Sequence, residues 1–290
     1  MQYTQSLLIG AIFVVVAEFC MASMGALVKV LGQTMPGEMA VFSRNLAGLL
    51  VLLPILVSHR DLSLKTEYFH LHLVRGLSGV LAMYCFFYAI INIPLADSML
   101  LKMTAPLFMP LVAIFWLKES VSSWTLYALG LGFIGVWIVL DPTGEMNWVV
   151  LIGILGGFLA AIAKVSIRRL SRTEPNLRVV FYFALIGTMV SLAPAVWQWK
   201  TPDLHSIGLM VAIGVVGTAG QLALTRAYSI ANAGTVAPLT YFSVIFGGIY
   251  GYLFWHEIPA DRFMFGALLI SIAGILTLKK RQSVSMDSAP

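Results

Sequence analysis

Three charged residues stand inside long apolar stretches of this sequence: Glu18, Arg44 and Lys102. A charge at the centre of a membrane-spanning helix costs roughly 2.5–3.5 kcal/mol on insertion scales, so such residues are usually functional. Each could bind an opposite charge on a substrate, and the carboxylate of Glu18 could carry a coupling proton. The alternative is a buried ion pair that only holds the fold, such as Glu18 with Arg44 or Lys102. We predict a role in substrate binding for all three.

Further polar and aromatic residues within apolar stretches extend this candidate site. Arg75 adds a third cation, although it is close enough to a span end to reach the membrane interface instead. Tyr84 and Tyr88 share one face at helical spacing, and ordinary helix packing is the alternative for both. The predicted substrate-binding residues are Glu18, Arg44, Arg75, Tyr84, Tyr88, Lys102, Gln221 and Tyr241. Their excess of cations predicts a substrate with an anionic group, either alone or as part of a zwitterion.

Other charges in the apolar stretches have simpler expected roles. Lys29, Lys164 and Arg226 lie near the ends of their stretches, where long side chains can extend to the interface. Asp97 directly follows Pro94-Leu95-Ala96, so we expect it to cap the start of a helix.

No cluster of His or Asp that could bind a metal or activate a nucleophile lies in the apolar interior of the sequence. The five histidines all lie near the ends of apolar stretches: His59, His70, His72, His205 and His256. No Walker A motif is present, and Cys20 and Cys85 predict no disulfide framework. We therefore expect no cofactor, no metal and no enzymatic activity, with an intramembrane enzyme or a passive channel as the minor alternatives.

The composition explains what must position these residues. Of 290 residues, 59% are hydrophobic and 11% are charged, and the mean hydropathy is +0.90. Soluble domains carry roughly 25% charged residues, so a soluble enzyme, a disordered chain and a nucleic-acid-binding domain are all excluded. The net charge of +5 comes from short basic connections between apolar runs, so the expected partner is the lipid bilayer.

Ten apolar runs are long enough to cross a membrane, which needs about 20 residues. They are 7–31, 38–58, 68–92, 95–117, 123–140, 148–168, 177–199, 205–230, 233–255 and 261–279. Their connections are short, so the predicted fold is an all-α membrane protein of ten transmembrane helices.

Basic residues in the connections orient the chain. With the N-terminus in the cytoplasm, the inside connections carry Arg60, Lys65, Lys118, Arg168, Arg169, Arg172, Arg178, Lys279, Lys280 and Arg281. The outside connections then carry only Lys200 and Arg262. This bias predicts a protein of the inner (plasma) membrane with both termini in the cytoplasm.

The two halves of the chain repeat one another. At a shift of 139, Thr34 aligns with Thr173 and Pro36 with Pro175; at 138, Glu119 aligns with Glu257. Five spans per unit place the halves in opposite orientations, as in many secondary transporters. We predict an inverted pair of five-helix repeats, 1–141 and 147–280, followed by a cytoplasmic tail, 281–290.

The three candidate charges have no charged counterparts at the equivalent positions of the second half. Glu18 aligns with Gly157, Arg44 with Phe183 and Lys102 with Thr240. Because the shared architecture requires matching halves and substrate chemistry does not, this asymmetry favours a functional role.

Several motifs resemble the EamA family of the drug/metabolite transporter superfamily over residues 7–279. They are Phe42-Ser43-Arg44, Leu73-Val74-Arg75-Gly76-Leu77, Tyr88-Ala89, Pro94-Leu95-Ala96-Asp97, Ala105-Pro106-Leu107-Phe108 and Lys118-Glu119, with Arg226-Ala227-Tyr228, Val236-Ala237-Pro238 and His256-Glu257 in the second half. The resemblance implies transport of a small metabolite or drug. It also suggests that Arg44 and Arg75 are general to the family, which favours a structural role for both. Lys102 departs from the family's usual small or apolar residue, which favours a role toward this protein's particular substrate.

The expected function is secondary active transport by alternating access. The expected substrate is a small polar organic metabolite that is amino-acid-, nucleoside- or vitamin-like. Export of drugs or toxic metabolites is the alternative. Protons or exchange could drive the transport, and a homodimer is one open possibility for assembly.

Overall fold

The fold is helical throughout the part of the chain that the structure describes. The computed structural model describes residues 2–58, 63–117, 123–140, 148–170, 173–230, 237–258, 261, 264–269 and 271–273, and no strand occurs among them. The predicted connection 141–147, the tail 281–290 and Lys118, Glu119 and Arg262 lie outside these residues.

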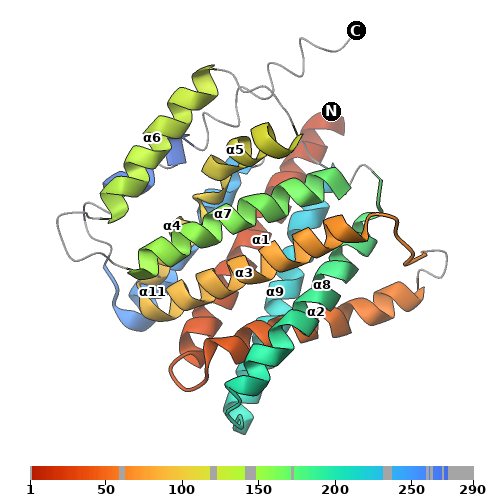
Figure 1. The fold of residues 1–290 in the computed structure, drawn as a ribbon. Coiled ribbons are helices and arrows are strands. Elements are labelled where there is room, and N and C mark those ends of the chain that lie inside the picture. The colour runs from red at the N-terminus through yellow and green to blue at the C-terminus, as the bar shows by residue number, and fades with distance from the viewer. Residues whose placement is uncertain are drawn as a thin grey trace.

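Ten α-helices and one 3₁₀ helix precede the helical stretch Met264–Ala273 in these described segments (Figure 1). Their bounds are α1 Gln2–Leu31, α2 Gly37–Ser58, α3 Phe69–Asn92, α4 Leu95–Lys102, α5 Ala105–Leu117, α6 Ser123–Leu140, α7 Trp148–Leu170, α8 Asn176–Trp197, α9 Leu204–Ile230, η1 Ala237–Tyr241 and α11 Phe242–Trp255.

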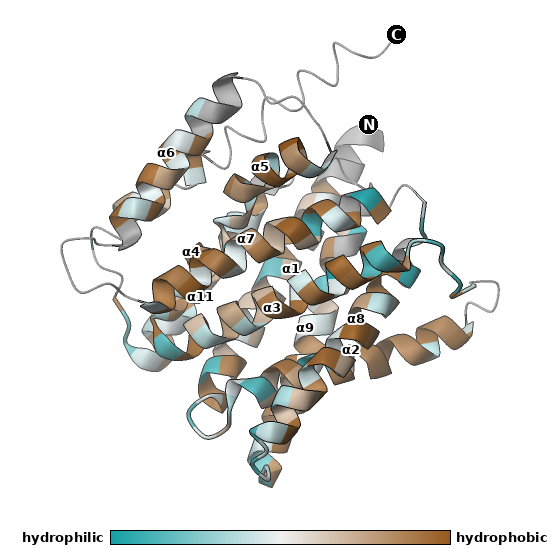
Figure 2. Cartoon of the chain, viewed as in Figure 1, coloured by the Kyte–Doolittle hydropathy of each residue, from teal (hydrophilic) through white to brown (hydrophobic). Residues whose placement is uncertain are grey.

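Seven helical stretches among these residues are long and apolar enough to cross a membrane. Three shorter apolar helices, Leu129–Ile138, Leu239–Trp255 and Met264–Ala273, fall within the other three predicted runs. Apolar residues cover most helices, and hydrophilic ones gather near several helix ends (Figure 2). Trp197 is 87% exposed and Phe115 is 85% exposed, which suits a surface in contact with lipid.

The fourth predicted run is broken in two. α4 ends at Lys102 and α5 begins at Ala105, with a turn at Met103 and Thr104 in which Thr104 Oγ1 donates to the carbonyl of Leu101 at 2.6 Å. Pro106 therefore lies in the first turn of α5, where its missing N–H leaves no helical hydrogen bond unmade. The break leaves Lys102 at a helix C-terminus, where the helix dipole favours a cation.

Helices that are distant in sequence pack together. α1 lies along α9, α3 along α7, and α2 against both α8 and α9. Glycines allow close approach at the α2–α9 contact and at the contact of α3 with α8. A Cβ on Gly76 of α3 would lie 2.5 Å from Ile186 Cγ2 of α8, and one on Gly214 of α9 would overlap Cβ of Ala47 on α2.

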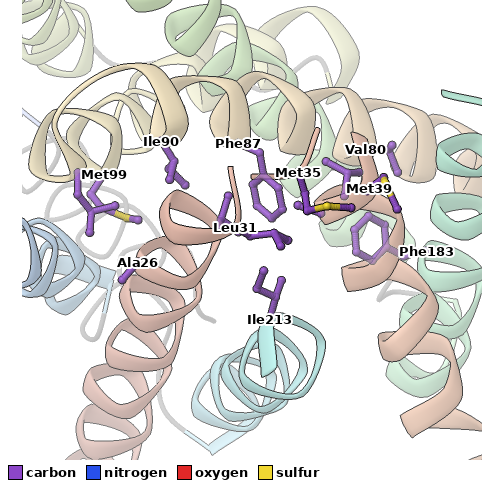
Figure 3. Close-up of a cluster of buried hydrophobic side chains, with 14 residues drawn as sticks. Ala26, Leu31, Met35, Met39, Val80, Phe87, Ile90, Met99, Phe183 and Ile213 are labelled. Atoms are coloured by element: carbon purple, nitrogen blue, oxygen red, sulfur yellow. The ribbon is translucent and has the colours of Figure 1, made fainter. Parts of the chain in front are cut away.

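The largest cluster of buried apolar side chains joins helices from both halves of the chain (Figure 3). It contains Ala26, Val28, Leu31, Met35, Met39, Ala40, Val41, Val80, Phe87, Ile90, Leu95, Met99, Phe183 and Ile213. Phe183 of α8 belongs to this cluster and lies near Met39 and Val80 in Figure 3. This core therefore fixes the ring against which two of the candidate cations pack.

Candidate transport site

Glu18 and Lys102 form an ion pair between α1 and the end of α4. Lys102 Nζ donates to Glu18 Oε2 at 3.2 Å. The Glu18 side chain is 3% exposed, whereas that of Lys102 is 27% exposed. Of the two partners weighed from the sequence, Glu18 therefore binds Lys102 and not Arg44. The Lys102 side chain is therefore partly accessible, whereas that of Glu18 is enclosed.

A second lysine acts on this pair. The charge of Lys164, on α7, interacts with the charges of Glu18 and Lys102 and more weakly with that of Arg75. Its side chain is exposed although α7 is one of the span-length helices. From the sequence we expected Lys164 only to extend to the membrane interface. Its interaction with Lys102 depends on how the helices pack, which local sequence does not indicate. Lys164 therefore adds positive charge to the region of the Glu18–Lys102 pair.

Arg44 and Arg75 lie together against the ring of Phe183. Their Cζ atoms are 5.6 Å and 4.0 Å from the ring centroid, within the range of cation–π attraction. Arg44 is 5% exposed and Arg75 is 8% exposed. We call Arg44, Arg75 and Phe183 the arginine cluster. It joins α2, α3 and α8, so it contains residues from both halves of the chain.

No anion of the described residues neutralises the arginine cluster. Neither guanidinium takes part in an ion pair among these residues, and both Nε atoms are buried without a hydrogen-bond partner. Burying a charge costs several kcal/mol, and a cation–π contact returns about 0.5–2 kcal/mol. Two neighbouring buried cations thus carry a desolvation cost that the ring of Phe183 does not offset.

Polar groups and small residues surround Arg44. Its Nη1 donates to Asn45 Oδ1 at 3.4 Å, while Asn45 Nδ2 and Thr218 Oγ1 are buried without partners. A Cβ on Gly217 would lie 3.6 Å from Arg44 Nε, and one on Gly48 would lie 3.4 Å from Thr218 Oγ1. Unused donors therefore face a region where two glycines keep side-chain volume low.

The predicted aromatic and amide residues are more dispersed. Tyr84 is half-buried, packs on the core of Figure 3, and has a buried hydroxyl without a partner. Tyr88 is 46% exposed, so the two tyrosines do not share one buried face. Tyr241, at the end of η1, packs on the apolar cluster that includes Leu100 and Met103 near the end of α4. Gln221 is half-buried on α9, the helix that lies along α1.

Lys29 and Glu257 form a charge cluster at the junction of α3 and α4. Lys29 Nζ contacts Glu257 Oε1 at 2.5 Å and donates to the carbonyl of Ile93 at 2.8 Å. Glu257 Oε2 accepts the N–H of Leu95, the first residue of α4. The expectation that Asp97 caps this helix was wrong: Asp97 makes no capping hydrogen bond, and its Oδ1 is buried without a partner. The carboxylate of Glu257, 160 residues downstream, takes that place.

Glu174 forms a second charge cluster at the other end of α3. It accepts hydrogen bonds from Thr66 Oγ1 and Arg178 Nη1, both at 2.6 Å, and lies 3.8 Å from His72 Nε2. Burial alone would raise the pKa of the Glu174 carboxyl. The hydrogen bonds and the nearby positive charge of Arg178 outweigh burial and lower the pKa below its usual value.

Metal chemistry has no evident site in the described segments. No group of three or more His, Cys, Asp or Glu residues that could hold a metal ion occurs there.

Known proteins resemble this chain along nearly its whole length. The chain is 35% identical over 270 residues to the pseudopaline exporter CntI of Pseudomonas aeruginosa (strain UCBPP-PA14), covering 92% of this chain and 94% of that protein. It is 29% identical over 261 residues to an S-adenosylmethionine uptake transporter of Rickettsia prowazekii, covering 90% and 88%. A protein crystal structure matches its fold with a TM-score of 0.64 at 19% identity, covering 96% and 98%.

The family model for the EamA-like transporter family matches residues 8–141 and again residues 147–279. These two matches leave little of the chain uncovered, and they agree with the transporter relatives and the span-length helices. The chain is a multi-pass membrane protein, and it belongs to the EamA-like transporter family.

Proposed function

We propose that this protein is a secondary transporter that moves a small polar organic metabolite across the inner (plasma) membrane by alternating access. Charges at membrane depth support this function, above all the Glu18–Lys102 pair with its partly accessible lysine. A pair needed only for folding would gain nothing from leaving Lys102 partly exposed. The proposed substrate-binding residues are Glu18, Arg44, Arg75, Tyr84, Tyr88, Lys102, Gln221 and Tyr241.

The packing of the helices supports two inverted five-helix repeats. Exchanging the proposed repeats turns the α1–α9 contact into α7–α3, and α2–α9 into α8–α3; both members of each exchange are observed. The contact of α1 with α11 likewise corresponds to that of α7 with α4 and α5. Two halves that pack in equivalent ways can exchange conformations at similar energy, which is what alternating access requires.

Contacts of individual residues in the first half also have counterparts at the equivalent positions of the second half. The N–H of Met35 donates to Leu31 at 2.9 Å, and the N–H of Glu174, 139 positions later, donates to Leu170 at 2.8 Å. Gly76 against Ile186 likewise corresponds to Gly214 against Ala47, at shifts of 138 and 139. These matches support the repeat over the first four spans of each half, and the predicted runs 123–140 and 261–279 would add the fifth.

The relatives leave two directions of transport open. Export is the second candidate because the 35% identical relative is an exporter of pseudopaline, while the Rickettsia relative takes up S-adenosylmethionine. The surplus of cations around Glu18 and in the arginine cluster favours a substrate with an anionic group. We further propose that Glu18 carries the coupling proton, since it is the enclosed carboxylate of the pair.

Counterflow in proteoliposomes tests this function. Purified protein is reconstituted and screened with mixtures of labelled polar metabolites, and any substrate found is then loaded inside to drive uptake of label. We expect saturable uptake and counterflow. We also expect Lys102→Met to reduce both at least tenfold, because the variant loses the partly accessible lysine.

Lys65→Gln is the matched control, since it also removes one lysine but from an exposed connection. Flux that rises linearly with substrate and shows no counterflow would indicate a channel. If the double variant Glu18→Gln, Lys102→Met regains the transport activity that Lys102→Met loses, the pair is structural and its assignment to the substrate-binding site is wrong.

A further inference from the structure

We propose that the arginine cluster is a carboxylate-binding subsite, separate from the Glu18–Lys102 pair. The proposal deepens the proposed function, because it names the chemical group of the substrate that these residues bind. Arg44 and Arg75 are each more than nine-tenths buried, and neither pairs with a carboxylate of the described residues. Two buried cations packed on the same ring are costly unless an anion compensates their charge.

The donors that remain unused fit a small planar anion. Each guanidinium keeps an unpartnered Nε, and the Asn45 amide and the Thr218 hydroxyl add neutral groups beside Arg44. A guanidinium can bind both oxygens of a carboxylate through two parallel hydrogen bonds, which neither a lysine nor a halide can reproduce. The cluster therefore suits a carboxylate better than a spherical anion.

The packing leaves the guanidinium groups little freedom to turn away. Phe183 lies in the buried core, and a Cβ on Gly79 would overlap the Nη1 atom of Arg75. Gly217 and Gly48 lie beside Arg44 at ordinary contact distance, since a Cβ on them would lie 3.6 Å from its Nε and 3.9 Å from its Nη1. Gly79 thus leaves the space that the Arg75 guanidinium fills. The Glu18–Lys102 pair, by contrast, already has its own counter-ion.

A thermal-shift titration of the purified full-length protein tests the subsite without any transport. Wild-type protein in detergent and low-salt HEPES buffer is titrated with sodium acetate, and in parallel with sodium chloride at equal ionic strength. We expect acetate to raise the Tm saturably by about 2–4 °C. We expect chloride to raise it less and without saturation, because charge screening has no defined site.

Substitutions identify where acetate binds. Arg75→Met should raise the Tm of the anion-free protein, since it removes one of two repelling cations, and should abolish the acetate response. Lys65→Gln is the matched control and should keep the wild-type response. Arg75→Lys keeps the charge but loses the paired donors, so it should bind acetate at least tenfold more weakly. It also serves as the deciding variant if Arg75→Met fails to fold.

The same measurements can overturn the proposal. An acetate response that equals the chloride response, or one that survives unchanged in both Arg75 variants, excludes a carboxylate subsite. Success of the acetate titration does not depend on counterflow, so failure of transport and failure of the subsite are distinguishable. Where a substrate is found, competitive inhibition of its transport by acetate would show that the arginine cluster binds a carboxylate of that substrate. Stimulation of transport by acetate would show that the cluster binds a separate, free anion.

Discussion

Glu174 shows how a buried acid can stabilise this fold through its partners. Its carboxylate connects the segment before α3, through Thr66, with the first turns of α8, through Arg178. Arg178 Nε also donates to the carbonyl of Ser63 at 2.8 Å. One ionised side chain thus holds residues 63–66 against the start of α8, and this role depends on its charge.

We predict that Glu174→Gln lowers the Tm at neutral pH and that the loss shrinks in acid. Because the folded-state pKa is lowered, the stabilisation is fully present above the unfolded-state pKa of about 4.3. It disappears as the pH falls through the lower folded-state value. Thermal unfolding of wild type and variant between pH 7 and pH 3 measures the difference.

Glu67→Gln is the control, since Glu67 is an exposed acid in the same connection. Its Tm difference from wild type should stay small at every pH. A Glu174→Gln difference that persists unchanged at pH 3 would mean that the loss comes from packing and not from charge.

Close approach of helices at glycines sets the geometry of the bundle. Gly214 of α9 faces Ala47 of α2, three residues from Arg44, so this contact also positions the arginine cluster. The methyl group of Ala47 is fixed to the backbone and cannot rotate aside. Any side chain at Gly214 must therefore move one helix relative to the other.

We expect Gly214→Ala to lower the Tm by several degrees, because overpacking costs roughly 1–3 kcal/mol and each kcal/mol shifts the Tm of a domain this large by about 2–4 °C. Gly208→Ala on the same helix is the matched control. No atom lies within 4 Å of a Cβ at Gly208. Alanine also favours the helix by about 0.5–1 kcal/mol over glycine, so this variant should be neutral or more stable. Equal Tm values for the two variants would show that the α2–α9 contact is loose.

The long helices could be predicted from the sequence because apolar length alone marks them. Seven span-length helices fall within the predicted runs. The break between Lys102 and Ala105 was not predicted: Pro106 within an apolar run suggests a bend, and only the structure places it in the first turn of a new helix. A hydropathy pattern cannot distinguish one bent helix from two successive helices.

The site shows the same limit at the level of contacts. Depth in an apolar run identified Glu18, Arg44 and Lys102, but their division into a Glu18–Lys102 pair and a separate arginine cluster depends on how five helices pack. Lys29 with Glu257 joins residues 228 positions apart, and no local spacing encodes such a pair. Lys164 near Lys102 is a further case of the same kind.

At the scale of the whole molecule, two charge clusters lie at opposite ends of α3. The Lys29–Glu257 cluster lies where α3 meets α4, and the Glu174 cluster lies where α3 begins. The proposed topology places the Glu174 end in the cytoplasm, where Lys65 and Arg169 also lie, and places the connection between α8 and α9 outside. Positive charge retained on the cytoplasmic side is the physical basis for this orientation.

Labelling of single cysteines by an impermeant maleimide checks the topology. Cys20 and Cys85 are first replaced with serine, and cysteine is then introduced at Thr201, before α9, or at Lys65, before α3; both positions are exposed. We expect Thr201→Cys to react in intact cells and Lys65→Cys to react only after permeabilisation. The proposed topology places an odd number of spans between the two positions, so they lie on opposite sides of the membrane. Labelling of both cysteines in intact cells would mean that an even number of spans separates them, which would contradict the proposed topology. The reverse pattern would place both termini outside and would invert the side from which the substrate first meets Lys102.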